Sequence, residues 1–305
     1  MELNSSLAET LKACGPFLVS GQGAIQGIVE VLVTVIAKKH PSQVAFDDDE
    51  DDIDANENSE DEWSLIGSAL DTVAGLARAL GPSFSEVFKI FQKLILIHVS
   101  ATSSTERTHA VGALADIIKG MKSGVTPYTT QLLKVLMHRL SDEDGQVKSN
   151  AAYAIGMLVQ NSDSEAEIKK AYPSILGKLE PLLHTTEARQ IDNAAGCVAR
   201  MISRYPDSLP LEEILPALVN LLPLKGDYEE NVAVWPMIVQ LYRAGNTTVQ
   251  ELTPQILPAM EKVLDEPEDQ LEEETRELLS QLVGYLASKQ PGLLQQFPGL
   301  AKAMQ

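Results

Sequence analysis

Hydrophobic residues recur every three to four positions along most of the chain, which is the spacing of one face of an α-helix. Segment 125–140 shows the period clearly, with Leu132, Leu133, Leu136 and Leu140 on one face. The same period marks segments 168–183, 214–222 and 249–264. No stretch alternates apolar and polar positions with β-branched and aromatic enrichment, so the pattern predicts helices and no sheet.

A second set of helices repeats between these segments. Each copy opens with an acidic or polar turn and continues with small and aliphatic residues, as in Asp144, Val147, Lys148, Ala151 and Ala152. The copies start at Trp63, Ser104, Asp144, Glu187, Tyr228 and Gln270, at spacings of 41, 40, 43, 41 and 42 residues. Two helices in each unit of about 40 residues is the period of armadillo and HEAT repeats.

Prolines and glycines are placed to delimit these helices. We expect prolines in first helical turns, at Pro127, Pro173 and Pro254, and stops at 120–124, Gly226, Gly245 and Pro291. The predicted fold is an all-α HEAT-repeat solenoid, a right-handed superhelix of antiparallel helix pairs. One array of about seven repeats would span 1–305. An irregular helical bundle is the alternative.

Composition agrees with helix-on-helix packing and adds a charge. Hydrophobic residues make up 44% of the chain but aromatic residues only 5%, so aliphatic side chains build the interior. The net charge of −19 repels nucleic acid and anionic lipid and attracts cationic partners. The most apolar stretch, 25–37, contains Glu30 and is too short to span a bilayer. Cys14 and Cys197 form no disulfide framework, which fits a reducing compartment.

Much of the charge is concentrated in one acidic run. Segment 47–62 holds 11 carboxylates and no basic residue, and without it the net charge of −19 becomes −8. We expect a disordered loop over 41–62, inserted between paired helices. It either keeps the protein in solution or captures basic cargo as a tethered polyanion.

The sequence carries no pattern typical of catalysis, of a cofactor site or of a metal site. The histidines are scattered at His40, His98, His109, His138 and His184, without the HExxH spacing or a cysteine pair for zinc. A phosphate-binding glycine loop and a nucleophile elbow are also missing. We therefore expect a binding protein and no enzyme.

Three motifs resemble the importin-β (karyopherin-β) family of nuclear transport receptors, in particular the branch that carries histones and ribosomal proteins. They are NAAYAIG at 150–156, IDNAAGCVAR at 191–200 and LLPLKGDYEEN at 221–231. The resemblance covers essentially the whole chain but only about the carboxy-terminal third of such a receptor. Met1 would enter the middle of a repeat, which predicts a piece of a longer protein.

The resemblance implies a receptor that shuttles between cytoplasm and nucleus and binds a lysine-rich import signal of core histones or ribosomal proteins. Contacts with Ran-GTP and nucleoporins would then belong to the parent receptor, and a monomer is expected. The residues that match the motifs, and that we expect to contact cargo, are Asn150, Tyr153, Asp192, Asn193, Glu229, Glu230, Asn231 and Trp235.

Physical reasoning supports the same residues. Stacked inner helices would place them in a row about 10 Å apart, within reach of lysines about three residues or more apart in an extended peptide. A lysine ammonium needs carboxylate and carbonyl acceptors for its three donors. Helix capping is the alternative for the Asn and Glu positions, and core packing is the alternative for Tyr153 and Trp235. A HEAT scaffold that assembles folded partners is the alternative function.

Overall fold

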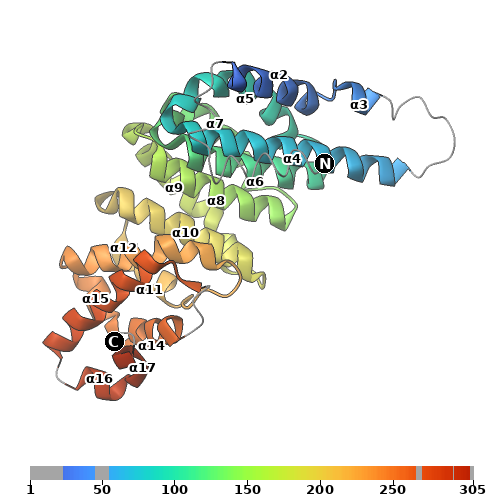
Figure 1. Ribbon diagram of the computed structural model, residues 1–305. Coiled ribbons are helices and arrows are strands. Elements are labelled where there is room, and N and C mark those ends of the chain that lie inside the picture. Colours follow the sequence, from blue (N-terminus) through green and yellow to red (C-terminus); the bar gives the residue numbers. More distant parts are fainter. Residues whose placement is uncertain (1–22, 45–54, 266–269, 291, 303–305) are drawn as a thin grey trace. The chain divides into compact units, whose positions relative to one another are not determined.

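The structure, a computed structural model, describes residues 23–44, 55–265, 270–290 and 292–302. Within these ranges every regular element is a helix (Figure 1). The chain divides into two compact units, the first up to Ile168 and the second from Lys169. The prediction of an all-α HEAT-repeat fold is confirmed.

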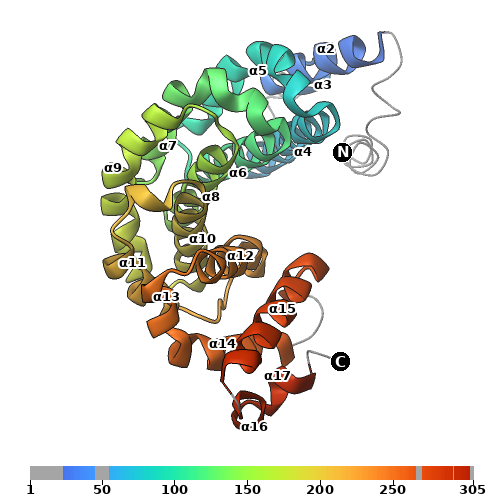
Figure 2. The same cartoon turned by 90° about the vertical axis from the view of Figure 1, so that its left-hand side faces the viewer.

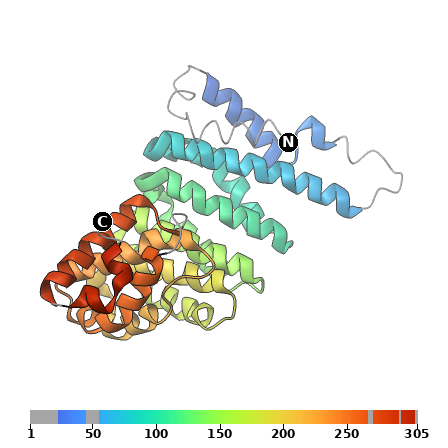
Figure 3. The ribbon, with the colours of Figure 1, turned by 60° about the horizontal axis from the view of Figure 1, so that its bottom comes forward.

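The first unit contains two layers of helices. Helices α4, α6 and α8 pack side by side in chain order, α5 packs on α2 and α6, and α7 packs on α8. Figure 2 separates the two layers, and Figure 3 shows α2, α4 and α6, coloured blue through teal, lying next to one another. The elements are α2 (Ala24–Ile36), α3 (Pro41–Val44), α4 (Ala55–Leu80), η1 (Gly81–Ser83), α5 (Phe84–Val99), α6 (Ser104–Met121), η2 (Lys122–Tyr128), α7 (Thr129–Arg139) and α8 (Gly145–Asn161), and the boundary between the units falls in α9 (Glu165–Leu183).

The second unit continues the same plan. Helix α12 packs against α10 and α15, and α14 packs against α17. Its elements are α10 (Ala188–Arg204), η3 (Pro206–Ser208), α11 (Leu211–Val219), η4 (Tyr228–Glu230), α12 (Asn231–Arg243), α13 (Thr247–Glu251), α14 (Thr253–Asp265), α15 (Glu273–Lys289), α16 (Leu293–Gln296) and α17 (Pro298–Lys302). None of the helices described for either unit is long and apolar enough to cross a bilayer.

Four of the six repeat starts predicted from the sequence lie at helix starts. Ser104 is the first residue of α6, and Asp144 caps α8 by accepting hydrogen bonds from the backbone N–H groups of Gln146 and Val147. Glu187 directly precedes α10, and η4 begins at Tyr228. Gln270 lies shortly before α15, but Trp63 lies well inside α4, which begins at Ala55.

Small residues allow the inner helices of the first unit to approach closely. Gly120 of α6 lies against the backbone of Ala77 and Arg78 in α4, and a Cβ atom there would lie 2.6 Å from the backbone nitrogen of Arg78. No side chain fits at that distance, so glycine is required. The aliphatic core around this contact includes the fully buried side chains of Leu76, Leu114 and Ile118.

Two sequence expectations need correction. The segment expected to be disordered over 41–62 is helical at both ends, in α3 and in the first turns of α4, while 45–54 lies outside the described residues. Pro127 lies inside η2 and Pro173 lies inside α9, so neither is in a first turn as expected. Helix α9 continues over 19 residues even though Pro173 cannot donate a backbone hydrogen bond.

Candidate functional site

Asn150 and Tyr153 lie one turn apart on α8, and both side chains are half-buried. The Asn150 Nδ2 donates a hydrogen bond of 2.9 Å to the backbone oxygen of Thr108 in α6. Gly112 makes room for this amide, because a Cβ atom on Gly112 would lie 3.2 Å from the Asn150 Nδ2. Asn150 therefore fixes α8 against α6 and keeps its Oδ1 as an acceptor.

Carboxylates lie close together on the two neighbouring helices of the same unit. Asp71 of α4 is exposed, and Asp116 of α6 is half-buried. The pKa of the Asp71 carboxyl is raised, mainly because surrounding protein removes part of its water, and further because Asp116 is close; His109 opposes the shift. The folded protein therefore disfavours the ionised form of Asp71.

Sequence reasoning did not select Asp71 or Asp116. Each is an isolated carboxylate in an otherwise apolar helical stretch, in GSALDTVAGLA and GALADIIKG. The isolation of each carboxylate could have been noticed in the sequence. Their proximity could not have been predicted, because it depends on how α4 packs on α6.

In the second unit, Asp192 holds a loop and does not face solvent. Its side chain is 2% exposed. The Oδ2 accepts hydrogen bonds of 2.9, 2.5 and 2.9 Å from the backbone N–H groups of three successive residues, Lys225, Gly226 and Asp227. A single ionised oxygen with three donors fixes the backbone of this loop strongly.

Asn193 strengthens the same attachment. Its Nδ2 donates hydrogen bonds of 3.1 Å to the backbone oxygen of Arg189 and to the Oδ2 of Asp227. The Arg189 Nε lies 3.4 Å from the same Asp227 oxygen. Both Asp192 and Asn193 belong to the second turn of α10, which begins at Ala188. Because both side chains bind the loop at 225–227, helix capping, the alternative considered for these positions, does not describe them.

Glu230 forms a buried ion pair with Arg200 of α10. The side chains are 1% and 4% exposed, Nη2 donates to Oε1 at 3.1 Å, and Nη1 donates to Oε2. Gly196 leaves the space that the carboxylate occupies, because a Cβ atom on Gly196 would lie 1.3 Å from the Glu230 Oε2.

Asn231 and Trp235 are also internal. The Trp235 side chain is fully buried, and its indole N–H donates a hydrogen bond of 3.1 Å to the Asn231 Oδ1. The Asn231 Nδ2 donates to the backbone oxygen of Gln270 at 2.9 Å. Core packing, the alternative considered for Trp235, is what the structure shows.

Two neighbouring side chains of this loop do face solvent. Tyr228 is 39% exposed, and Glu229 is exposed as well. They lie between Asp227 and Glu230, which are both held by α10. Of the eight side chains expected to contact cargo, only Glu229 is exposed, Asn150 and Tyr153 are half-buried, and the remaining five are buried and support the fold.

The described residues offer little for metal or thiol chemistry. Within these ranges no group of three or more His, Cys, Asp or Glu side chains could hold a metal ion. Complete burial raises the pKa of the Cys197 thiol from 9.0 to about 12, so it stays protonated at neutral pH.

No protein-family model matches the chain, but curated proteins and solved structures do. It is 35% identical over 286 residues to "Probable importin subunit beta-4" of Schizosaccharomyces pombe, covering 91% of this chain and 27% of that protein. It is 28% identical over 292 residues to Importin-4 of Homo sapiens, covering 95% of this chain and 26% of that protein. The chain therefore spans about a quarter of the length of these relatives.

Solved structures share the fold. The karyopherin Kap121p bound to the SUMO protease Ulp1p superposes with a TM-score of 0.65 at 16% identity, covering 99% of this chain and 28% of that one. Kap95p bound to RanGDP superposes with a TM-score of 0.57 at 15% identity, covering 99% of this chain and 37% of that one. These likenesses support the HEAT-repeat assignment.

Proposed function

We propose that this chain, which is homologous to a part of the importin-β family receptors, binds lysine-rich import segments of cargo proteins such as core histones and ribosomal proteins. The observation that carries the proposal is the pair of neighbouring carboxylates of Asp71 and Asp116 in the first unit. The pKa of Asp71 is raised mainly by partial loss of water and further by Asp116, and a lysine ammonium placed between the two carboxylates would offset the repulsion between them.

The neighbouring helix supplies the rest of a lysine site. An ammonium group has three N–H donors, and the two carboxylates and the Asn150 Oδ1 are acceptors of the types that it needs. The Tyr153 ring, on the same face of α8, could cover the apolar stem of the lysine. Packed helices lie about 8–10 Å apart, and an extended peptide advances about 3.3–3.6 Å per residue, so lysines about three residues apart would reach successive helices of the unit.

A second lysine contact is proposed at Tyr228 and Glu229 of the second unit. The bonds from α10 to Asp227 and Glu230 hold the backbone on both sides of these residues. Because the loop is already ordered, little conformational entropy is lost when cargo binds. The Glu229 carboxylate would pair with the ammonium while the Tyr228 ring contacts the stem.

The charge of the chain supports a basic partner. A net charge of −19, much of it in segment 47–62, accelerates encounters with cationic segments and makes their affinity fall with salt. The same charge disfavours nucleic acid as a direct ligand. We further propose that the chain is a binding receptor without enzymatic activity that works as a monomer.

Contacts with Ran-GTP and nucleoporins, and shuttling between cytoplasm and nucleus, are proposed only for a longer receptor of which this chain corresponds to about a quarter. Such partners are seen in solved structures of other karyopherins, in Kap121p bound to Nup53p and in Kap95p with RanGDP.

Calorimetric titration of a lysine-rich core-histone tail peptide tests the proposal against the scaffold alternative. We expect a Kd of about 1 µM or tighter near physiological salt, which corresponds to about −8 kcal/mol. The affinity should weaken when salt is raised and when the lysines are acetylated. A scaffold for folded partners predicts no binding of this peptide, and that result would overturn the proposal.

A further inference from the structure

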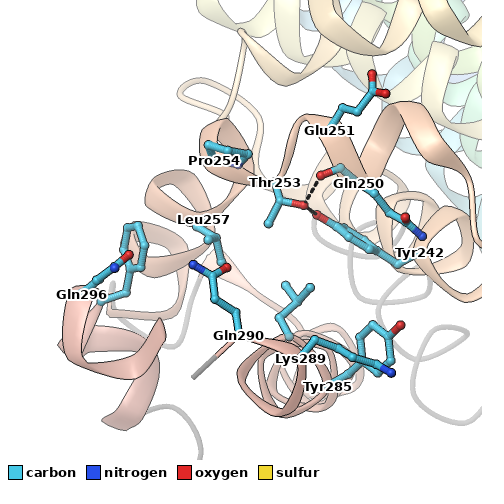
Figure 4. A pocket seen from close by; sticks show the side chains of 12 residues that line it. Tyr242, Gln250, Glu251, Thr253, Pro254, Leu257, Tyr285, Lys289, Gln290 and Gln296 are labelled. Atoms are coloured by element: carbon cyan, nitrogen blue, oxygen red, sulfur yellow. Dashed lines mark hydrogen bonds between the residues drawn. The ribbon is translucent and has the colours of Figure 1, made fainter. Parts of the chain in front are cut away.

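The second unit contains a cavity of about 680 Å³ that the proposed lysine sites do not use. It lies between α12, the α13–α14 segment and the α15–α16 segment (Figure 4). Its volume falls in the range of protein sites that hold a ligand or an anchoring side chain. Part of its wall is apolar, from Leu257, Leu286 and Phe297.

A smaller cavity of about 230 Å³ adjoins the first, and both are lined by Tyr242 and Tyr285. Tyr242 is fixed, since its hydroxyl lies 2.6 Å from the Thr253 Oγ1. Tyr285 is 49% exposed. An exposed ring between two cavities can contact an extended ligand that enters both.

Two side-chain amides that line the larger cavity make no hydrogen bond to other described residues. In the part of the chain that the structure describes, the amides of Gln250 and Gln290 have no hydrogen-bond partner, and the Gln290 amide points into the cavity beside Leu257 (Figure 4). Such groups bind the N–H and C=O groups of a peptide backbone and suit an extended segment.

Two cations border the cavities, and among the described residues neither has a carboxylate partner. The Lys289 Nζ lies 5.7 Å from the centroid of the Tyr285 ring, and Arg243 donates a hydrogen bond of 3.2 Å to Gln281. Other cations of this acidic chain do pair with carboxylates, as Lys302 does with Asp265. The one carboxylate that lines the larger cavity, Glu251, is on the side away from Lys289 and Tyr285 (Figure 4).

We propose that the two adjoining cavities form one groove, and that this groove binds a segment of a partner protein in which an apolar side chain is flanked by carboxylates. The apolar side chain enters the cavity beside Leu257 and Leu286, and the carboxylates face Lys289 and Arg243. Glu251 keeps acidic residues away from the opposite side and so fixes the direction of the segment. This partner has the opposite charge to lysine-rich cargo, so the inference stands apart from the proposed function.

Fluorescence titrations with two matched peptides test this inference. Each peptide carries the same Leu-Phe pair, flanked by four residues of Glu or of Gln. The Glu peptide should bind at least about tenfold more tightly than the Gln peptide. The Arg243→Glu/Lys289→Glu variant should abolish the preference for Glu, and Tyr285→Ala should weaken the Glu peptide about tenfold.

The Lys170→Glu/Lys262→Glu variant is the control, because it makes the same charge change at exposed positions outside both cavities. It should leave the preference for the Glu peptide unchanged. Equal binding of the Gln and Glu peptides, failure of both to bind, or equal effects of the two double variants would each overturn the inference.

Discussion

Arg200 of α10 and Glu230 of η4 form an ion pair with side chains that are 4% and 1% exposed. Removing one partner of such a pair leaves an uncompensated charge away from water. This relationship assigns Glu230 to the fold, whereas the sequence placed it among the cargo contacts beside Glu229.

The adjacent glutamates should therefore respond differently to truncation. Glu230→Ala should lower the free energy of unfolding by about 3–5 kcal/mol, because Arg200 stays buried without its carboxylate. Glu229→Ala, at an exposed position, should change it by less than about 0.5 kcal/mol. Urea denaturation of both variants measures the difference, and similar midpoints would contradict the assignment.

Asp192→Asn should loosen the loop at 225–227. The substitution replaces a charged acceptor of three backbone N–H groups by a neutral amide, which should cost about 1.5–3 kcal/mol. Hydrogen exchange of these amides should become faster while the core amides of α10 change less. Asp207→Asn, at an exposed position of η3, is the control. Unchanged exchange of the loop amides in Asp192→Asn would show that the bonds do not hold it.

The helices could be predicted well because each repeat places the same small and aliphatic residues at the same turn. The candidate site could be predicted only in part. A carboxylate near a helix start reads the same in the sequence whether it faces solvent, as Glu229 does, or a neighbouring helix, as Glu230 does. The partners that decide the matter lie about one repeat away, as Arg200 lies 30 residues from Glu230.

The raised pKa of Asp71 gives a signed prediction for stability against pH. Because the folded state binds this proton more tightly than the unfolded state does, the protonated carboxyl stabilises the fold below the unfolded pKa of 3.8. That contribution is lost as pH rises through the folded-state pKa. Asp71→Asn should therefore stabilise the protein at pH 7, by less than about 1 kcal/mol because the side chain is exposed. The gain should vanish below the unfolded pKa. Thermal unfolding across this pH range measures it, and a loss of stability at pH 7 would contradict the account.

Burial of Cys197, which raises its pKa to about 12, should make the thiol unreactive in the native protein. In a Cys14→Ser background, which leaves Cys197 as the single thiol, a disulfide reagent at pH 8 should label it only after unfolding. Stability should also fall as pH rises above 9.0, because the thiol ionises more easily in the unfolded chain. Fast labelling without denaturant would contradict the burial of this residue.

We propose that the neighbouring carboxylates of Asp71 and Asp116 in the first unit bind lysine. The most direct measurement is a calorimetric titration of a lysine-rich core-histone tail peptide into the Asp71→Asn/Asp116→Asn variant. The control, Glu180→Gln/Glu213→Gln, removes the same two charges at exposed positions of α9 and α11. We predict a Kd raised about tenfold or more in the first variant and by less than about twofold in the control. Equal affinities in the two variants would contradict the claim.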